Sequence, residues 1–330
     1  MNLFKRISVL VLSFSVLLSS AAAFAATAPP PTAGTAPGSG LSISPLHNQL
    51  NLNPGDSATL QINVKNITQN SVLAKAYVND FTSDNNTGNP VIITDPNKTL
   101  NTSIKKFVHV QDIPLAVGEQ KKVTIPVSIP SGYTPGAYYG IIRFRAIPAG
   151  TEAPKDGEVS LSASVGTIVL IQVKGNLKES SQLSALKVYN DDKSGTIFFK
   201  KPNKAGVEIK NLGNSFVQPF GKVTLNNMSG KTIYSYEVNN TNPRATVLPG
   251  SKRMFIDPIK NIGKPGRYTL SASIATDNGS NVLVSQKTFW YITGWLLVLV
   301  LAVIAVLIIA TFLAYRHYAK SRRRNKRSHR

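Results

Sequence analysis

The chain has 330 residues, with 37 Lys and Arg against 16 Asp and Glu, and its formal net charge is +21. It contains no cysteine, which excludes disulfide scaffolds and cysteine-based metal sites. Because small extracellular sandwiches of animals usually carry a disulfide, an exported β-rich chain without one indicates a bacterial envelope.

Residues 1–25 are typical of a cleavable signal peptide. Two cations precede an apolar run at 7–18, and small residues then lead to a cleavage site before residue 26. An uncleaved N-terminal anchor is the alternative, which the shortness of the run disfavours. Residues 26–40, ATAPPPTAGTAPGSG, follow as a Pro/Ala/Gly-rich linker that cannot build a core.

A turn followed by an alternating strand occurs three times in the chain. The copies are NPGDSATLQINVKN (53–66), AVGEQKKVTIPVSIP (116–130) and LPGSKRMFIDPI (248–259). In the first copy a Pro-Gly pair fits a tight turn, and apolar residues then alternate with polar ones. The motif predicts half-buried strands, and its role is structural rather than catalytic.

The same alternation predicts further strands, among them residues 71–82, 105–113, 137–147 and 158–175. No helical periodicity of useful length appears before residue 292. The stretch NDFTSDNNTGNP (79–90) is rich in oxygen ligands of the kind that bind calcium, but it lacks the EF-hand spacing. We therefore interpret it as a connecting loop and predict no metal site.

Two tyrosines mark a second repeat. Tyr138 and Tyr268 each follow a Pro-Gly turn, head an apolar strand face, and can bond the preceding loop through the hydroxyl, as at the tyrosine corner of immunoglobulin-like sandwiches. The polar stretch GNLKESSQ (175–182) lies between the two copies. The chain is therefore predicted to be all-β, with two tandem immunoglobulin-like β-sandwich domains at 41–175 and 180–290.

The strand YYGIIRFRAI offers a candidate ligand-binding face. Tyr139, Arg143 and Arg145 alternate with the core-directed residues and so share the opposite face of the sheet. An aromatic ring and two guanidinium groups suit a glycan or an anionic polymer. Arginine on a solvated sheet face is also common without any ligand, and this alternative stays open.

A long apolar run, ITGWLLVLVLAVIAVLIIATFLAY (292–315), has the length and composition of a transmembrane helix. Residues predicted to lie at the membrane interface are Trp290, Tyr291, Trp295 and Arg316. The tail, residues 316–330, carries eight Lys or Arg and no acid. The positive-inside rule predicts a single-pass protein of the cell membrane, with a cytoplasmic tail drawn to anionic lipid and the other domains extracellular.

The exported part remains basic when the signal and tail are set aside. Ten of the 37 cations lie in those two segments, which leaves 27 against 16 acids, a charge of about +11. A basic surface outside the membrane suits anionic polymers of the cell wall, and mere solubility is the alternative. Nucleic-acid binding is not expected, because no accompanying motif is present.

Signatures of catalysis are scarce. His47 and His109 stand far apart without a triad context, and neither HExxH, a P-loop nor GxGxxG occurs. We therefore predict no catalytic residue, no metal site, no cofactor and no enzymatic activity.

The segments HNQLNLNPGDSATLQINVKN, FVHVQDIPLAVGEQKKVTIPVSIP and PGAYYGIIRF resemble the N-terminal domain of the WxL-interacting surface proteins of Gram-positive bacteria. The resemblance implies an exported peptidoglycan-binding sandwich at 41–175, followed by a second sandwich, one membrane span and a basic tail. The second domain departs from the host-binding pattern of that family, so host binding is not implied.

The sequence thus predicts a membrane-anchored, non-enzymatic surface protein that binds a cell-wall polymer, namely a peptidoglycan-like glycan, or another surface protein. A chaperone-like or structural scaffold is the alternative, in which a strand edge pairs with another exported protein.

Overall fold

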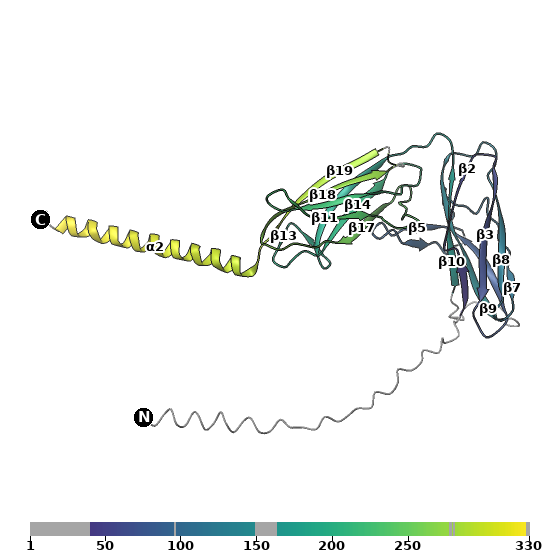
Figure 1. Cartoon of the computed structure of the whole chain (residues 1–330), viewed down its shortest axis with the longest axis horizontal. Coiled ribbons are helices and arrows are strands. Elements are labelled where there is room, and N and C mark those ends of the chain that lie inside the picture. Colours follow the sequence, from purple (N-terminus) through teal and green to yellow (C-terminus); the bar gives the residue numbers. More distant parts are fainter. Residues whose placement is uncertain (1–39, 96, 149–163, 277–278, 280, 328–330) are drawn as a thin grey trace, which may run out of the picture. The chain divides into compact units, whose positions relative to one another are not determined.

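We describe the protein from a computed structural model, which covers residues 40–95, 97–148, 164–276, 279 and 281–327. The predicted signal peptide and all but the last residue of the predicted linker lie outside the described residues. Residues 39–330 group into one compact unit. The prediction of an all-β chain followed by one apolar C-terminal helix is confirmed (Figure 1).

The first half of the described chain forms two facing sheets, the N-terminal sheet pair. Their strand orders are β1-β3-β8 and β2-β10-β9-β4-β7, and the hairpin β5-β6 is separate. The strands are β1 (Leu41–Ser44), β2 (His47–Leu52), β3 (Ser57–Asn66), β4 (Val72–Asn79), β5 (Phe81–Ser83), β6 (Pro90–Ile92), β7 (Ile113–Leu115), β8 (Gln120–Ser128), β9 (Gly136–Pro148) and β10 (Ser164–Val173).

Alternation along each strand builds the core between these two sheets. Leu60, Ile62 and Val64 of β3 are almost fully buried, while Gln61 and Lys65, which alternate with them, are exposed. Residues of both sheets join one hydrophobic cluster, which gives the pair its two-layer form.

The second half repeats this arrangement as the C-terminal sheet pair, with orders β12-β11-β14-β17 and β13-β19-β18-β15-β16 around a separate hydrophobic cluster. The strands are β11 (Ser181–Asn190), β12 (Lys193–Gly195), β13 (Ile197–Phe198), β14 (Lys204–Asn211), β15 (Phe220–Asn226), β16 (Thr232–Val238), β17 (Lys252–Pro258), β18 (Gly266–Thr276) and β19 (Asn281–Tyr291). The division into two immunoglobulin-like domains stays a prediction.

The predicted strand at 105–113 is wrong for most of its length. Only Ile113 enters a strand, β7; residues 105–107 form a turn, Val108 makes an isolated bridge to Val127, and residues 109–112 are irregular. The amides of Phe107 and Val108 both donate to the carbonyl of Ile104, and both side chains are buried. Two neighbouring residues cannot both face the core from an extended strand, so the segment folds into a tight turn that fills the core.

The second and third copies of the turn motif are each held in place by a buried asparagine of a neighbouring strand. Asn66, at the end of β3, donates from Nδ2 to the carbonyl of Ala116 at 3.0 Å, and its amide donates to Glu119 at 2.9 Å. Asn211, at the end of β14, does the same with Val247 at 3.0 Å and Ser251 at 3.0 Å. Each sheet pair therefore fastens its turn to a neighbouring strand by the same buried amide.

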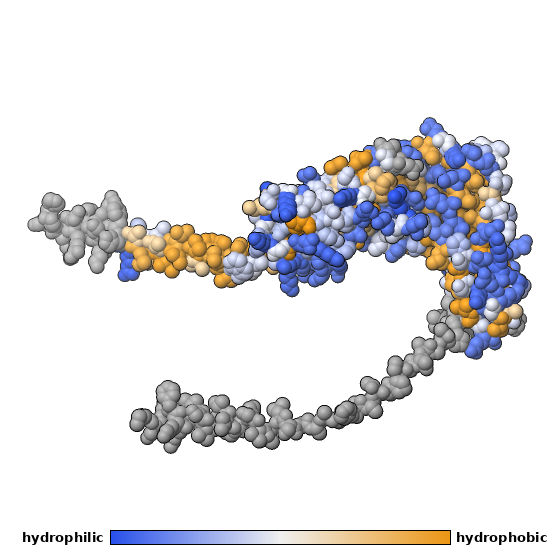
Figure 2. Space-filling view, in the orientation of Figure 1, coloured by the Kyte–Doolittle hydropathy of each residue, from blue (hydrophilic) through white to orange (hydrophobic). Residues whose placement is uncertain are grey.

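The C-terminal helix α2 (Gly294–Arg327) contains a segment, Gly294–Arg316, that is long and apolar enough to cross a membrane. Figure 2 shows this segment as a continuous hydrophobic surface. The helix begins two residues later than the predicted span and continues into the predicted tail.

Candidate functional site

The outer face of β9 divides into two parts with different surroundings. Tyr139 is only 7% exposed and its ring lies 5.1 Å from Phe81 and 6.2 Å from Phe216. It belongs to a small cluster, the junction cluster, which joins the two sheet pairs and whose buried members are Phe81, Tyr139, Ile141, Leu170 and Leu248. The structure therefore places Tyr139 in a contact between the sheet pairs rather than on open surface.

Polar contacts surround the junction cluster. The side-chain oxygen of Gln172 in β10 accepts hydrogen bonds from Ser215 Oγ at 3.1 Å and from the Phe216 amide at 3.2 Å. The carbonyl of Asn214 accepts from the Ala137 amide at 2.8 Å. The segment 214–216 is therefore fastened to two strands of the N-terminal sheet pair.

The other end of the same face carries a basic and aromatic group, which we call the β4–β9 patch. It consists of Lys75, Tyr77, Arg143 and Arg145, and the strand register sets Lys75 opposite Arg145 and Tyr77 opposite Arg143. All four side chains are partly exposed. The two arginines were predicted from the sequence, whereas Lys75 and Tyr77 join them only through the pairing of β4 with β9.

Neighbouring groups fix the position of Arg143. Its Nε donates to Asn79 Oδ1 at 3.1 Å, and its guanidinium carbon lies 5.9 Å from the centre of the Tyr77 ring. Gly166 stands opposite on β10, where a Cβ would come within 3.0 Å of Arg143 Cγ. The glycine thus leaves the arginine room to lie along the sheet.

The charges of the β4–β9 patch lack carboxylate partners among the described residues. Neither Arg143, Arg145 nor Lys75 forms an ion pair there, and Arg145 Nε is buried without a hydrogen bond. Like charges directly opposite one another on a sheet destabilise it. A bound anion would relieve this repulsion.

The stretch at 79–90, considered as a calcium loop, forms the hairpin β5-β6. Asp84 accepts hydrogen bonds from Thr87 and from the amides of Asn86 and Gly88, which lower its pKa to about 2. The oxygens of this carboxylate are therefore engaged in hydrogen bonds with residues of the same loop. Among the described residues no group of three or more His, Asp or Glu could hold a metal ion.

The same hairpin covers part of a strand edge. The Met254 amide of β17 donates to the carbonyl of Asn86 at 2.7 Å, and the Arg253 side chain packs so closely on Gly88 that a Cβ there would lie 2.6 Å from it. β17 ends its sheet, so this contact occupies some of the edge that an added strand would need.

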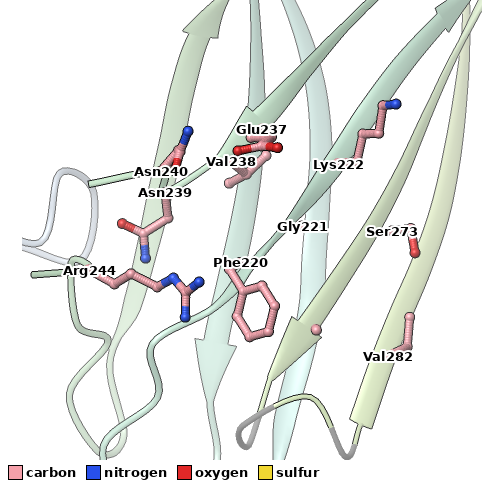
Figure 3. A pocket seen from close by; sticks show the side chains of 11 residues that line it. Phe220, Gly221, Lys222, Glu237, Val238, Asn239, Asn240, Arg244, Ser273 and Val282 are labelled. Carbon is pink, nitrogen blue, oxygen red and sulfur yellow. The ribbon is translucent and has the colours of Figure 1, made fainter. Parts of the chain in front are cut away.

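A shallow groove lies on the outer face of the second five-stranded sheet, with a volume of about 450 Å³. Figure 3 shows the Arg244 guanidinium beside the Phe220 ring, with Lys222 and Glu237 further along. The guanidinium carbon lies 4.1 Å from the centre of that ring. Asn239 fixes the rim of this groove. Its Nδ2 donates to the carbonyls of Pro219 and Ala245, and its Oδ1 accepts from the Ala245 amide.

The predicted interface residues have different environments. Trp290 and Trp295 are 46% and 63% exposed, and Arg316 is exposed at the end of the apolar segment. Tyr291 is 6% exposed and belongs to the core of the C-terminal sheet pair. Its position within the core leaves little of its ring for contact with lipid.

The two predicted corner tyrosines occupy equivalent places. Tyr138 Oη donates to the carbonyl of Thr134 at 2.9 Å, and Tyr268 Oη donates to that of Lys264 at 2.5 Å. Burial raises the pKa of both hydroxyls. Each stays protonated and able to donate at neutral pH.

A search of curated proteins finds no significant match. Among solved structures the chain is similar to the YadV chaperone, at 14% identity and a TM-score of 0.34, over 76% of this chain and 99% of that one. It is also similar to the E. coli chaperone DraB, at 16% identity and a TM-score of 0.33, over 76% and 97%. TM-scores this far below 0.5 do not establish a shared function.

A family model described as WxL Interacting Protein, peptidoglycan binding domain, matches residues 46–146. This range runs from the residue before β2 into β9 and contains all four residues of the β4–β9 patch. The predicted resemblance to WxL-interacting surface proteins is confirmed over this range. Residues 46–146 are therefore similar to the peptidoglycan binding domain of WxL Interacting Protein.

Proposed function

We propose that the chain is a membrane-anchored, non-enzymatic surface protein that binds a cell-wall polymer through residues 46–146. The observation that carries this proposal is the match of that range to a peptidoglycan-binding family. The apolar segment of α2 supplies an anchor of sufficient length. The basic residues after it favour a cytoplasmic tail and an extracellular position for both sheet pairs.

The β4–β9 patch is the part of the domain that we assign to the polymer. Peptidoglycan presents carboxylates on its peptide stems and apolar sugar faces on its glycan strands. Arg143 and Arg145 can bind carboxylates through two parallel hydrogen bonds, and the Tyr77 ring can pack against a sugar face. Arg143 is already held by Asn79, so less side-chain entropy is lost when it binds.

Sedimentation of the full-length protein with purified cell walls tests this assignment. Hydrogen bonds to charged groups contribute about 1.5–3 kcal/mol each, so the double substitution R143Q/R145Q should weaken binding at least about ten-fold. Walls stripped of teichoic acid by acid should still bind the wild-type protein, because the family match points to peptidoglycan.

The matched control is K65Q/K122Q, which removes the same charge from the opposite sheet. Lys65 and Lys122 lie exposed on β3 and β8 and make no ion pair with a described residue. Equal loss of binding in both double variants would show that only the total charge matters. Unchanged binding by R143Q/R145Q would remove the patch from the proposal.

A further inference from the structure

A short strand ties a surface segment to the chain just before the helix. β13 pairs in parallel with the end of β19, where Ile197 stands opposite Trp290 and Phe198 opposite Tyr291. The Trp290 amide donates to the carbonyl of Thr196 and the Ile292 amide to that of Phe198, both at 2.8 Å. The segment 196–199 is therefore fixed beside residues 290–292.

Apolar side chains of this region face outward. Phe198 is 6% exposed and lies in the core, so Ile197 and Phe199, its neighbours, point away from it, and each is 57% exposed. Trp290 is 46% exposed beside them, and Met228, in the nearby turn between β15 and β16, is 69% exposed. Large apolar side chains clustered at one end of a sheet pair signal a contact surface.

The distance to the candidate membrane span is short. Two residues separate Tyr291, in the core, from Gly294, the first residue of α2, so the chain between them spans at most about 11 Å. Paired strands lie about 4.8 Å apart, so Ile197 and Phe198 are nearly as close to the start of the span as Tyr291 is. This holds whatever the direction of the helix.

Lysines surround the apolar residues. The loops that meet at this end of the C-terminal sheet pair, together with the first residue of β12, carry six exposed lysines, and Asp191 and Asp192 are the acids of the same loops. The register brings these loops together, because Gly266 pairs with Tyr291 and Lys204 with Pro258. The lysines are Lys193, Lys200, Lys201, Lys231, Lys260 and Lys264.

We propose that this end of the C-terminal sheet pair is a lipid-contacting surface, in which Ile197, Phe199 and Trp290 enter the headgroup region and the lysines bind lipid phosphates. Apolar and aromatic side chains flanked by lysine are the groups that favour the membrane interface. The surface adjoins the candidate membrane span of the same chain, and the bilayer is therefore the partner that we assign to it. The inference depends on the membrane anchoring in the proposed function.

Site-specific fluorescence tests the proposal, because the chain has no cysteine and a single introduced thiol is unique. Full-length F199C carrying an environment-sensitive dye is reconstituted in bilayers that contain anionic lipid and a headgroup-attached quencher. The control V282C labels an exposed residue at the far end of β19. A label at A302C, inside the apolar segment, reports insertion of α2 with an acyl-chain quencher.

We expect several-fold stronger quenching at position 199 than at 282, and a decrease at 199 when K200Q and K201Q are added. Equal quenching at 199 and 282, with A302C inserted, would overturn the lipid-contacting surface and leave the anchor intact. Absence of quenching at A302C would instead overturn the anchor, and the inference with it.

Discussion

Neighbouring residues of β9 show what a sequence can and cannot establish about a side chain. The alternation correctly assigned Tyr138 and Tyr139 to opposite faces of the strand. It could not establish that the outer face at Tyr139 is covered, because Phe216 and Leu248, which cover it, come from the other sheet pair. The two arginines lie beyond that cover and are partly exposed, and their ligand role stays a prediction.

The corner tyrosines give a prediction at this scale. Tyr138→Phe and Tyr268→Phe keep the ring and remove the hydrogen bond to the loop, so each should lower the free energy of unfolding by about 0.5–1.5 kcal/mol. Thermal unfolding of the full-length protein in detergent measures the change. Tyr234→Phe is the control, since Tyr234 is partly buried and its hydroxyl bonds no described residue. A similar loss there would contradict the role of the corner bonds.

At the scale of elements, strands were predictable where polar and apolar residues alternate and where a strand packs one face against a single hydrophobic core. The segment at 105–113 has apolar residues in a mixed order, and its buried pair, Phe107 and Val108, is satisfied only by a turn. The parallel pairing of β13 with β19 could not be predicted, because parallel register depends on tertiary structure. The repeated turn motif was predictable, whereas the asparagines that hold it were not recognised.

These asparagines supply the prediction for this scale. Asn66→Ala or Asn211→Ala leaves buried carbonyl groups without their donor, and each should lower the free energy of unfolding by about 1–3 kcal/mol. Chemical denaturation of the full-length protein tests both.

Asn51→Ala provides the matched control, because Asn51 is exposed on β2. We expect it to change stability by less than about 0.5 kcal/mol. If the two buried asparagines were no more costly to remove than Asn51, the shared fastening of the turns would have no energetic role.

For the whole molecule, composition and the order of segments already indicated an exported, basic, anchored protein. The net charge could not show where that charge acts, because basic residues gather at two separate places. One is the β4–β9 patch, with Lys75, Arg143 and Arg145, and the other is the lysine-rich end of the C-terminal sheet pair next to α2. Folding, rather than composition, separates a candidate wall-binding surface from a candidate lipid-binding surface.

This separation predicts how wall binding responds to salt and pH. Binding should fall below about pH 4, where the carboxylates of the polymer become protonated and lose the charge that the patch would bind. Raising salt from 0.05 to 0.5 M should weaken binding several-fold, and less so in R143Q/R145Q. Binding that does not change with salt concentration would indicate that charged groups do not contribute to the contact with the wall.

The pairing of β19 with β18 also determines how the anchored protein would bear tension. β11 begins at Ser181, beside Asn211, and runs toward the end where β13 meets Tyr291. If the proposed wall binding and membrane anchoring hold, a pull between the two would act along the strands of the C-terminal sheet pair. For the sheet to unfold under this force, β19 must slide along β18, with which it forms eleven residue pairs. The hydrogen bonds of these pairs would then be loaded together rather than broken one after another from a strand end. The last strand before the apolar helix would thus be loaded in shear, the direction in which a sheet shares force among many hydrogen bonds.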